Sequence, residues 1–518
     1  MMKKLIYIGA TVLFAFLILL PLLLMITSSF FEHGVFTLHN YLNILNKNNL
    51  LLLFRSTVLS FAVATLSTLI GGFFAFTLTK TNLPMRGGLK LLFLIPLFIS
   101  PYILAVSWVD FFILFKNGAQ FIYGPAGVIF VLSLILVPLS IIIISSGLIN
   151  VDTRLEEAGL MMADYRTTLV KIVLPLLKPA IVSSFVLSFV LAISEFSVPA
   201  FLSVNMLTTE IFMQFSAFYN YDLAVANSML LIVICISLLM AERYYLADAP
   251  FFSVSAKSSI SKKIELEKSK YPLLFIHFSY LTFAVLTPVI VLALQSFNDG
   301  PTLFLKAFTI LSAVMIDSLL YAAAGAFFLL VFGLVFAYMS ERDGFKALNF
   351  VLLLTFGIPS TVLGIGLIKF FNTPSLHFIY SGFWIIIIGY LGRFIFISEK
   401  IISNAVKQIS PSFEEAAYIS GAGFILRIRK ILVPLISEGL VAAFLLGFIF
   451  SLSELGTTIL VYPPGTSVIP VTVYTIMANA PQTLTSALSL IVLALTFLSL
   501  LTLYAGHRFL VKRKWGTY

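Results

Sequence analysis

Charged residues are scarce in this chain, and their scarcity excludes several classes of protein. Asp, Glu, Lys and Arg make up only 10% of the 518 residues, whereas soluble globular domains carry about 25%. Hydrophobic residues account for 60%, and the mean hydropathy is +1.07. An ordinary soluble enzyme or binding module is therefore excluded, and the composition indicates an integral membrane protein.

Side chains with reactive or metal-binding chemistry are also rare. The one cysteine, Cys235, lies in the apolar stretch LLIVICISLL, so an internal disulfide is excluded and a small buried side chain is expected. The five histidines form no i, i+4 pair of the kind that binds zinc. The segment G-x-x-x-x-G-K-[ST], which cradles nucleotide phosphates, is absent as well. We therefore expect no catalytic residue, no metal site and no bound cofactor in this chain.

Long apolar runs dominate the sequence instead. Because a transmembrane helix needs about 20 mostly apolar residues, we predict about twelve spans. They lie near 5–27, 54–78, 89–114, 124–148, 179–202, 223–242, 272–295, 314–338, 347–370, 380–398, 439–462 and 484–506. The runs lack the alternation of barrel strands, so the predicted fold class is an all-α polytopic membrane protein.

The cations of the chain indicate its orientation. The net charge of +10 comes mostly from Lys and Arg in short, alternate loops, which is the pattern of cytoplasmic loops and not of a nucleic-acid-binding surface. Lys3, Lys4 and the basic C-terminal segment 508–514 belong to this set. We expect a multi-pass protein of the cytoplasmic (inner) membrane with both termini in the cytoplasm.

The chain contains an internal duplication. Glu195 and Glu454 are 259 residues apart, and so are Pro175 and Pro434. The polar, Ser/Lys-rich stretch between the sixth and seventh spans is typical of a linker. We predict a first domain at 1–243, a cytoplasmic linker at 244–270 and a second domain at 271–518. Six spans per half is an even number, so the two halves lie parallel in the membrane.

Each half carries one unusual cytoplasmic loop between its fourth and fifth spans, at 153–178 and at 411–437. The second loop reads EEAAYISGAGFILRIRKILVP. Ser412 is suited to cap a helix whose first turn holds two acids, and the glycines at 421 and 423 are suited to end it. The pattern predicts a helix–turn–helix knob that projects from the membrane and fits a groove on a partner protein.

The second loop resembles the EAA loop of binding-protein-dependent ABC-transporter permeases. Glu415, Ala416, Ala417, Gly421 and Pro434 match that motif in register. The first loop places Glu156, Glu157, Ala158, Met162 and Pro175 at these positions, so it departs from the motif at Glu157 and Met162 and asymmetric coupling is expected. The candidate coupling residues are Glu156, Glu157, Ala158, Met162, Ala163, Glu414, Glu415, Ala416, Ala417, Gly421 and Ala422.

This resemblance implies two permease domains fused in one polypeptide. It implies two copies of a cytoplasmic ABC ATPase that seat the EAA loops and that bind ATP and Mg, so that this chain itself is no enzyme. It also implies an extracytoplasmic solute-binding protein that delivers substrate. The phrases ISEFSVPAFL and LSELGTTILVYPPGTSVIP are most similar to the ferric-iron importer group, with thiamine and phosphonate importers as neighbours.

Five residues inside the predicted spans are candidates for the pathway or its gate. Acids are costly there and usually face a cavity or a partner. Two interpretations stay open for Glu195, Glu454 and Asp110: hydrogen bonding at a helix break that shapes a gate, or direct contact with substrate. Pro101 and Pro359 mark helix-breaking stretches in the third span of each half, and irregular backbone at membrane depth is tolerated where it lines a cavity.

The alternative function is a secondary transporter with six plus six helices, driven by an ion gradient. Such proteins usually carry a basic, glycine-containing loop between their second and third spans. The segments TKTNLPMRGG and SERDGFK match that feature only in part, and this alternative leaves the two EAA-like loops unexplained.

Overall fold

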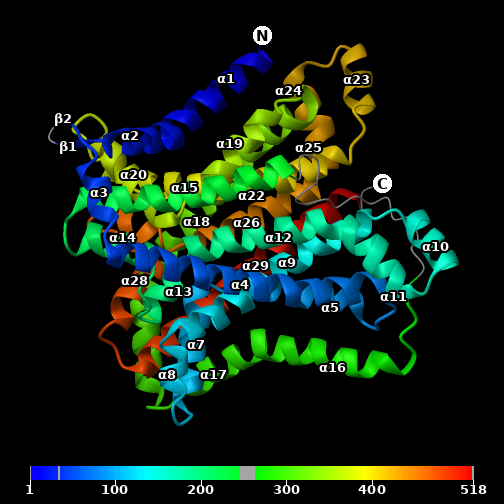
Figure 1. Ribbon diagram of the computed structural model, residues 1–518. Helices are drawn as coiled ribbons and strands as arrows, with labels where there is room; N and C mark the ends of the chain where they lie inside the picture. Colours follow the sequence, from blue (N-terminus) through cyan, green and yellow to red (C-terminus); the bar gives the residue numbers. More distant parts are fainter. Residues whose placement is uncertain (1, 33–34, 246–262, 516–518) are drawn as a thin grey trace. The chain divides into compact units, whose positions relative to one another are not determined.

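The computed structural model describes residues 2–32, 35–245 and 263–515 (Figure 1). Most of the predicted linker at 244–270 lies outside these residues. The described residues fold into helices, apart from connecting segments and one short antiparallel pair, β1 (Phe31–Glu32) and β2 (Val35–Phe36). The predicted all-α polytopic fold class is confirmed.

The chain packs into two compact units, each described here by itself. Unit I comprises 1–50, 207–232 and 292–518, and unit II comprises 51–206 and 233–291. The first predicted span of the first half, 5–27, therefore lies in unit I with most of the second half. Most of the first predicted span of the second half, 272–295, lies in unit II with most of the first half. Packing defines these units, whereas repetition defines the predicted domains 1–243 and 271–518, so the predicted domain bounds stay a prediction.

Unit II is built mainly from the helices of the first half. Its elements are α4 (Lys47–Lys80), α5 (Arg86–Leu92), α6 (Ile95–Phe98), α7 (Pro101–Ile113), α8 (Gly118–Ile122), α9 (Pro125–Asn150), α10 (Thr153–Met162), α11 (Tyr165–Thr168), α12 (Leu174–Ser194), α13 (Ser197–Phe201), part of α15 (Tyr221–Tyr245), α16 (Lys270–Leu281) and part of α17 (Thr287–Ser296). The helices α4 and α9 approach closely, because a Cβ on Gly71 would lie 2.4 Å from Cβ of Ser140. Small residues at such crossings are typical of membrane helix pairs.

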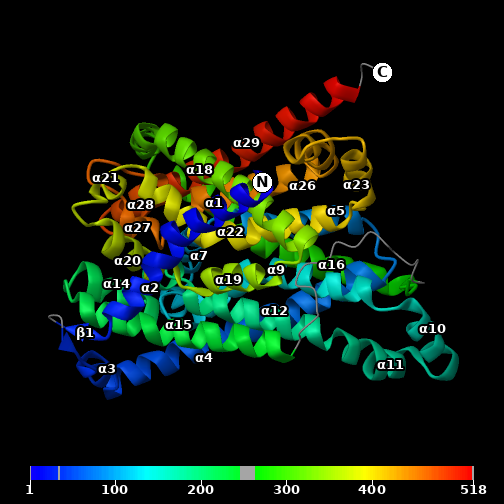
Figure 2. The ribbon, with the colours of Figure 1, turned by 90° about the horizontal axis from the view of Figure 1, so that it is seen from above.

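Unit I combines the start of the chain with the second half. Its elements are α1 (Met2–Phe14), α2 (Leu20–Ser28), α3 (His39–Ile44), α14 (Leu207–Ser216), part of α15, α18 (Pro301–Asp343), α19 (Lys346–Gly357), α20 (Ser360–Phe371), α21 (His377–Tyr380), α22 (Trp384–Lys407), α23 (Ser412–Ile419), α24 (Phe424–Arg427), α25 (Val433–Leu435), α26 (Ser437–Ser453), α27 (Thr458–Val461), α28 (Ile469–Met477) and α29 (Gln482–Trp515). The long helix α18 packs against α22, α26 and α29 (Figure 2).

Eight helices of the described chain are long and apolar enough to cross a membrane, and three bent helix pairs raise the number to eleven. The remaining predicted span, near 380–398, corresponds to α22. This 24-residue helix also contains the charged residues Arg393, Glu399 and Lys400.

Helix geometry repeats with the same spacing as the sequence. π-Helical turns occur at 169–173 and 428–432, which are 259 residues apart, and at 15–19 and 282–286, which are 267 apart. Pro175, Pro434, Pro21 and Pro288 each follow two residues after such a turn. A proline donates no N–H, and its ring crowds the carbonyl four residues earlier, which here falls inside the turn. The widened turn relieves that crowding.

The third span of each half is sharply broken, as the prolines predict. Helices α5–α6 and α7 meet at 92°, and α19 and α20 meet at 99°. Ser100, before Pro101, and Ile358, before Pro359, have extended backbones, because a following proline disfavours the helical conformation. The breaks interrupt the helical hydrogen bonds and leave backbone groups that need other partners.

Candidate functional site

The first of the two loops, at 153–178, folds into α10 and α11, which extend from the α9–α12 bundle of unit II (Figure 1). Asp152 begins α10 as its cap, because its side chain accepts the N–H of Arg154 at 2.9 Å. Asp164 precedes α11 and accepts the Thr167 hydroxyl at 2.5 Å. That hydrogen bond lowers the pKa of the Asp164 carboxyl. We call α10 and α11 the first knob.

The second loop forms the predicted helix–turn–helix, which we call the second knob: α23 and α24. Gly421 ends α23 with φ +84°, a conformation that suits glycine. The N–H of Ala422 donates to the carbonyl of Ala417, and the N–H of Gly421 donates to that of Tyr418, both at 2.9 Å. This pair of bonds is the Schellman motif, so the glycine gives the bend a defined geometry.

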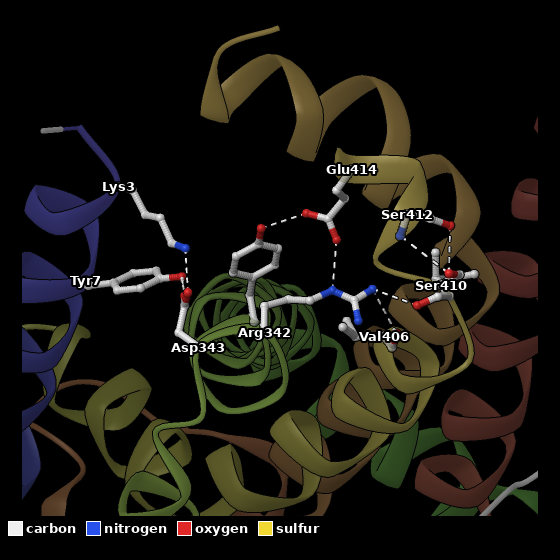
Figure 3. A network of polar contacts seen from close by, with 10 residues as sticks. Lys3, Tyr7, Arg342, Asp343, Val406, Ser410, Ser412 and Glu414 are labelled. Atoms are coloured by element: carbon white, nitrogen blue, oxygen red, sulfur yellow. Dashed lines mark hydrogen bonds and ion pairs between the residues drawn. The ribbon is translucent and has the colours of Figure 1, made fainter. Parts of the chain in front are cut away.

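A buried acid fixes the base of each knob. In unit II, Lys80 Nζ lies 2.6 Å from Glu156 Oε2, and the two side chains are only 3% and 8% exposed. In unit I, the Tyr338 hydroxyl donates to Glu414 at 2.6 Å and Arg342 Nε donates to it at 2.8 Å (Figure 3). Charge-assisted hydrogen bonds in a buried setting are strong and directional, so both knobs are rigidly joined to the end of a long helix.

These contacts revise the correspondence between the two loops. Glu156 and Glu414 are the acids buried at the bases of the two knobs, and each is paired with a cation near the end of the preceding long helix, whereas Glu415 is exposed. Glu156 is therefore the structural counterpart of Glu414 and not of Glu415. Glu156 and Glu414 are 258 residues apart, whereas Pro175 and Pro434, which follow the knobs, are 259 apart. The second knob therefore holds one additional residue near its bend.

The revised correspondence brings the first loop closer to the motif. Glu157, Ala158 and Gly159 now occupy the positions of Glu415, Ala416 and Ala417. Ala163 has φ −152° and directly precedes the N-cap residue of α11, so it corresponds to Ala422, which directly precedes the N-cap residue of α24, and not to Gly421 with φ +84°. The departure predicted at Glu157 arose because both loops were assumed to have equal lengths, whereas the first loop still lacks a glycine at its bend, as the departure at Met162 predicted.

The tips of both knobs expose apolar side chains. Met161 and Met162 are 90% and 91% exposed on the first knob, and Tyr418 and Ile419 are 67% and 84% exposed on the second. Large apolar side chains grouped on a polar loop mark a protein interaction surface. Glu415 is exposed beside them, whereas Glu414 is buried.

The acids Glu195 and Glu454 lie at corresponding helix breaks. Glu454 accepts the N–H of Thr457 at 2.8 Å, and it accepts both the N–H of Thr458 at 2.9 Å and its hydroxyl at 2.6 Å, so it caps α27. Glu195 accepts the N–H of Ser197 at 2.9 Å and also its hydroxyl, at the start of α13. These are the bonds expected from the helix-break interpretation. The role of either acid in transport stays a prediction.

The remaining pathway candidates lie at or near helix ends. Asp110 is buried in α7, and its charge adds to the effect of burial in raising the pKa of the Tyr123 hydroxyl. Pro101 is the first residue of α7, and Pro359 directly precedes α20. The structure brings neither proline into a hydrogen-bonded cluster with the acids.

Sequence reasoning missed Arg393 of α22. Its guanidinium donates to the carbonyls of Phe356 at 3.1 Å and Ile358 at 2.9 Å, which are at the end of α19 where the span breaks. Only 8% of Arg393 is exposed. A lone cation in an apolar run was the available signal, because such a charge needs acceptors within the protein.

Comparison with known proteins agrees with this arrangement. The family described as "Binding-protein-dependent transport system inner membrane component" matches residues 67–246 and 329–515, once in each half. The chain is 25% identical to the putative ferric transport system permease protein FbpB 1 of Haemophilus influenzae, over 88% of this chain and 77% of the relative.

Two further relatives extend the comparison. The ferric transport system permease protein FbpB of Actinobacillus pleuropneumoniae is 24% identical over 88% of this chain and 71% of its own length. The putative 2-aminoethylphosphonate transport system permease protein PhnV of Salmonella typhimurium is 28% identical over 36% of this chain and 72% of its own length. The two family matches together cover most of the length of this chain. This chain therefore belongs to the inner-membrane components of binding-protein-dependent transport systems and is a permease subunit of an ABC importer with two fused domains.

Proposed function

We propose that this permease forms the translocation pathway for ferric iron. The ferric transport permeases align with 88% of this chain, whereas the phosphonate permeases align with 36%. Iron is therefore the first candidate substrate and phosphonate the second. Thiamine has no support among these relatives and ranks third.

We also propose that two copies of a cytoplasmic ABC ATPase dock on the two knobs. The observation that carries this proposal is the combination of a rigid base and an exposed apolar tip on each knob. A knob can transmit the movement of an ATPase to the membrane helices only if its base is rigid. A buried ion pair makes the base rigid. ATP and Mg would bind to the ATPase copies, so hydrolysis belongs to them and not to this chain.

The same proposal places both termini and both knobs in the cytoplasm. Within unit I, Lys3 near the N-terminus lies 2.6 Å from Asp343, beside the second knob, so these two parts share one side of the membrane. The separate solute-binding protein would then meet the opposite side, where it delivers its cargo.

Recognition of iron would belong mainly to that binding protein. Among the described residues, no three His, Cys, Asp or Glu side chains gather closely enough to hold a metal ion. Glu454 already accepts three hydrogen bonds, which leaves it little capacity to bind a cation tightly. A pathway that binds its substrate weakly releases it readily.

Reconstitution tests this function. The permease would be placed in liposomes with its ATPase and its binding protein, and uptake of Fe³⁺, 2-aminoethylphosphonate and thiamine would be compared with and without ATP. ATP-dependent uptake of Fe³⁺ alone is expected. Uptake of another solute would overturn the iron assignment, and proton-driven uptake by the isolated chain would restore the secondary-transporter alternative.

A further inference from the structure

A second polar cluster lies directly beside the base of the second knob (Figure 3). Lys3 Nζ of α1 lies 2.6 Å from Asp343 Oδ1, and the Tyr7 hydroxyl donates to the other oxygen of the same carboxylate. Asp343 is the last residue of α18 and follows Arg342, which holds Glu414. The N-terminal helix and the second knob are thus attached to the same helix end.

The first helix also contacts the knob itself. Phe424, the first residue of α24, meets the ring of Tyr7 edge-on, with ring centres 6.5 Å apart. It meets the ring of Tyr338 edge-on from a second direction, at 5.6 Å. Lys3 Nζ lies 5.9 Å from the centre of the Phe424 ring, within cation–π range. Phe424 is therefore held between α1 and α18.

The counterpart in unit II has different chemistry. The spacing of 267 residues places Lys270 and Leu274 of α16 at the positions of Lys3 and Tyr7. Leu274 packs against an apolar cluster that includes Val173, which lies just after the first knob. Lys270 Nζ instead lies over the ring of its neighbour Tyr271, at 5.2 Å. The two knobs are consequently supported by unlike contacts.

We propose that Lys3, Tyr7 and Asp343 are positioning residues for the second knob. They form a brace between α1 and the start of α24 that sets the angle of α24. This inference rests on the proposed function, in which the knob couples an ATPase to transport. The Lys3 and Asp343 side chains are 35% and 25% exposed, and partly exposed pairs contribute little to stability. The brace therefore acts chiefly on orientation.

The variants Lys3→Met and Tyr7→Phe test the brace in the complete complex of permease, ATPase and binding protein. We expect Fe³⁺ imported per ATP hydrolysed to fall about fivefold in Lys3→Met, which corresponds to about 1 kcal/mol. Tyr7→Phe is expected to fall in the same direction. The matched control is Lys270→Met, which removes the counterpart lysine and should leave the ratio within twofold of the wild type.

Two further readouts separate positioning from a general loss of structure. The charge exchange Lys3→Asp with Asp343→Lys should restore at least half of the lost ratio, because the pair reforms with its signs reversed. A spin label at Ile425, an exposed position of α24, should become more mobile in Lys3→Met and not in Lys270→Met. Thermal unfolding should stay within a few degrees of the wild type throughout.

The possible results separate failure of the brace from failure of the proposed function. Unchanged coupling and unchanged label mobility in Lys3→Met overturn the brace while leaving the proposed function intact. Equal losses in Lys3→Met and Lys270→Met, or no recovery on charge exchange, also overturn it. If the wild-type chain couples no uptake to ATP, the proposed function fails and the brace falls with it.

Discussion

Removing one partner of the buried pair at the first knob should loosen that knob selectively. The change is Lys80→Met, which keeps an apolar stem of similar length and leaves Glu156 buried without its cation. The structure predicts a large effect, because the two side chains are 3% and 8% exposed and their charged atoms are 2.6 Å apart. An uncompensated buried charge costs about 3–5 kcal/mol.

Hydrogen exchange of the α10 amides, measured in nanodiscs, reports this loss locally. Since each 1.4 kcal/mol is a factor of ten, exchange by local opening should accelerate roughly a hundred- to several-thousand-fold. Amides in the middle of α9 serve as the internal control and should change little. The double variant Lys80→Met with Glu156→Gln should recover much of the protection, because no buried charge is then left unpaired.

The reasoning is refuted by either of two results. Acceleration below tenfold in Lys80→Met would mean that the pair does not hold the knob. Failure of the double variant to recover would mean that packing of the lysine stem, and not charge, supplies the stability.

Four other changes have defined outcomes. Gly421→Pro should lower Fe³⁺ import per ATP at least tenfold with the helices still folded, because proline cannot adopt φ +84°; Gly423→Ala is the control, since its Cβ would meet nothing within 4 Å. Arg393→Met should destabilise the chain by about 2–6 kcal/mol in thermal unfolding, because two buried carbonyls lose their donor. Glu454→Gln should cost about 1–3 kcal/mol of stability and leave Fe³⁺ uptake within twofold, as should Glu195→Gln.

Each of these expectations has a contrary result. Wild-type coupling in Gly421→Pro would count against docking at the second knob. Wild-type stability in Arg393→Met would show that water replaces the guanidinium at the break. Abolished uptake in a folded Glu454→Gln variant would favour direct contact between this acid and the substrate.

Local rules predicted the parts of this structure that depend on neighbouring residues. The glycine bend of the second knob and the breaks before Pro101 and Pro359 follow from backbone preferences over four or five residues. The position of the knobs followed from polar composition between apolar runs.

Contacts between distant residues were beyond such rules. The partner of Glu156 is 76 residues away, and no local pattern connects it to Lys80. The one-residue shift between the loops was missed for a related reason, since a bend can gain a residue without changing its motif. Arg393 was overlooked because its acceptors are backbone carbonyls, which every sequence contains.

The attachment of α1 to the end of α18 has a consequence for biosynthesis. Lys3 and Asp343 are separated by 340 residues. At about 5–20 residues per second, the ribosome needs roughly 20–70 s to make the second partner after the first. During that interval α1 resides in the bilayer without its final neighbours, so the nascent chain must keep an early helix available until most of the protein has been translated.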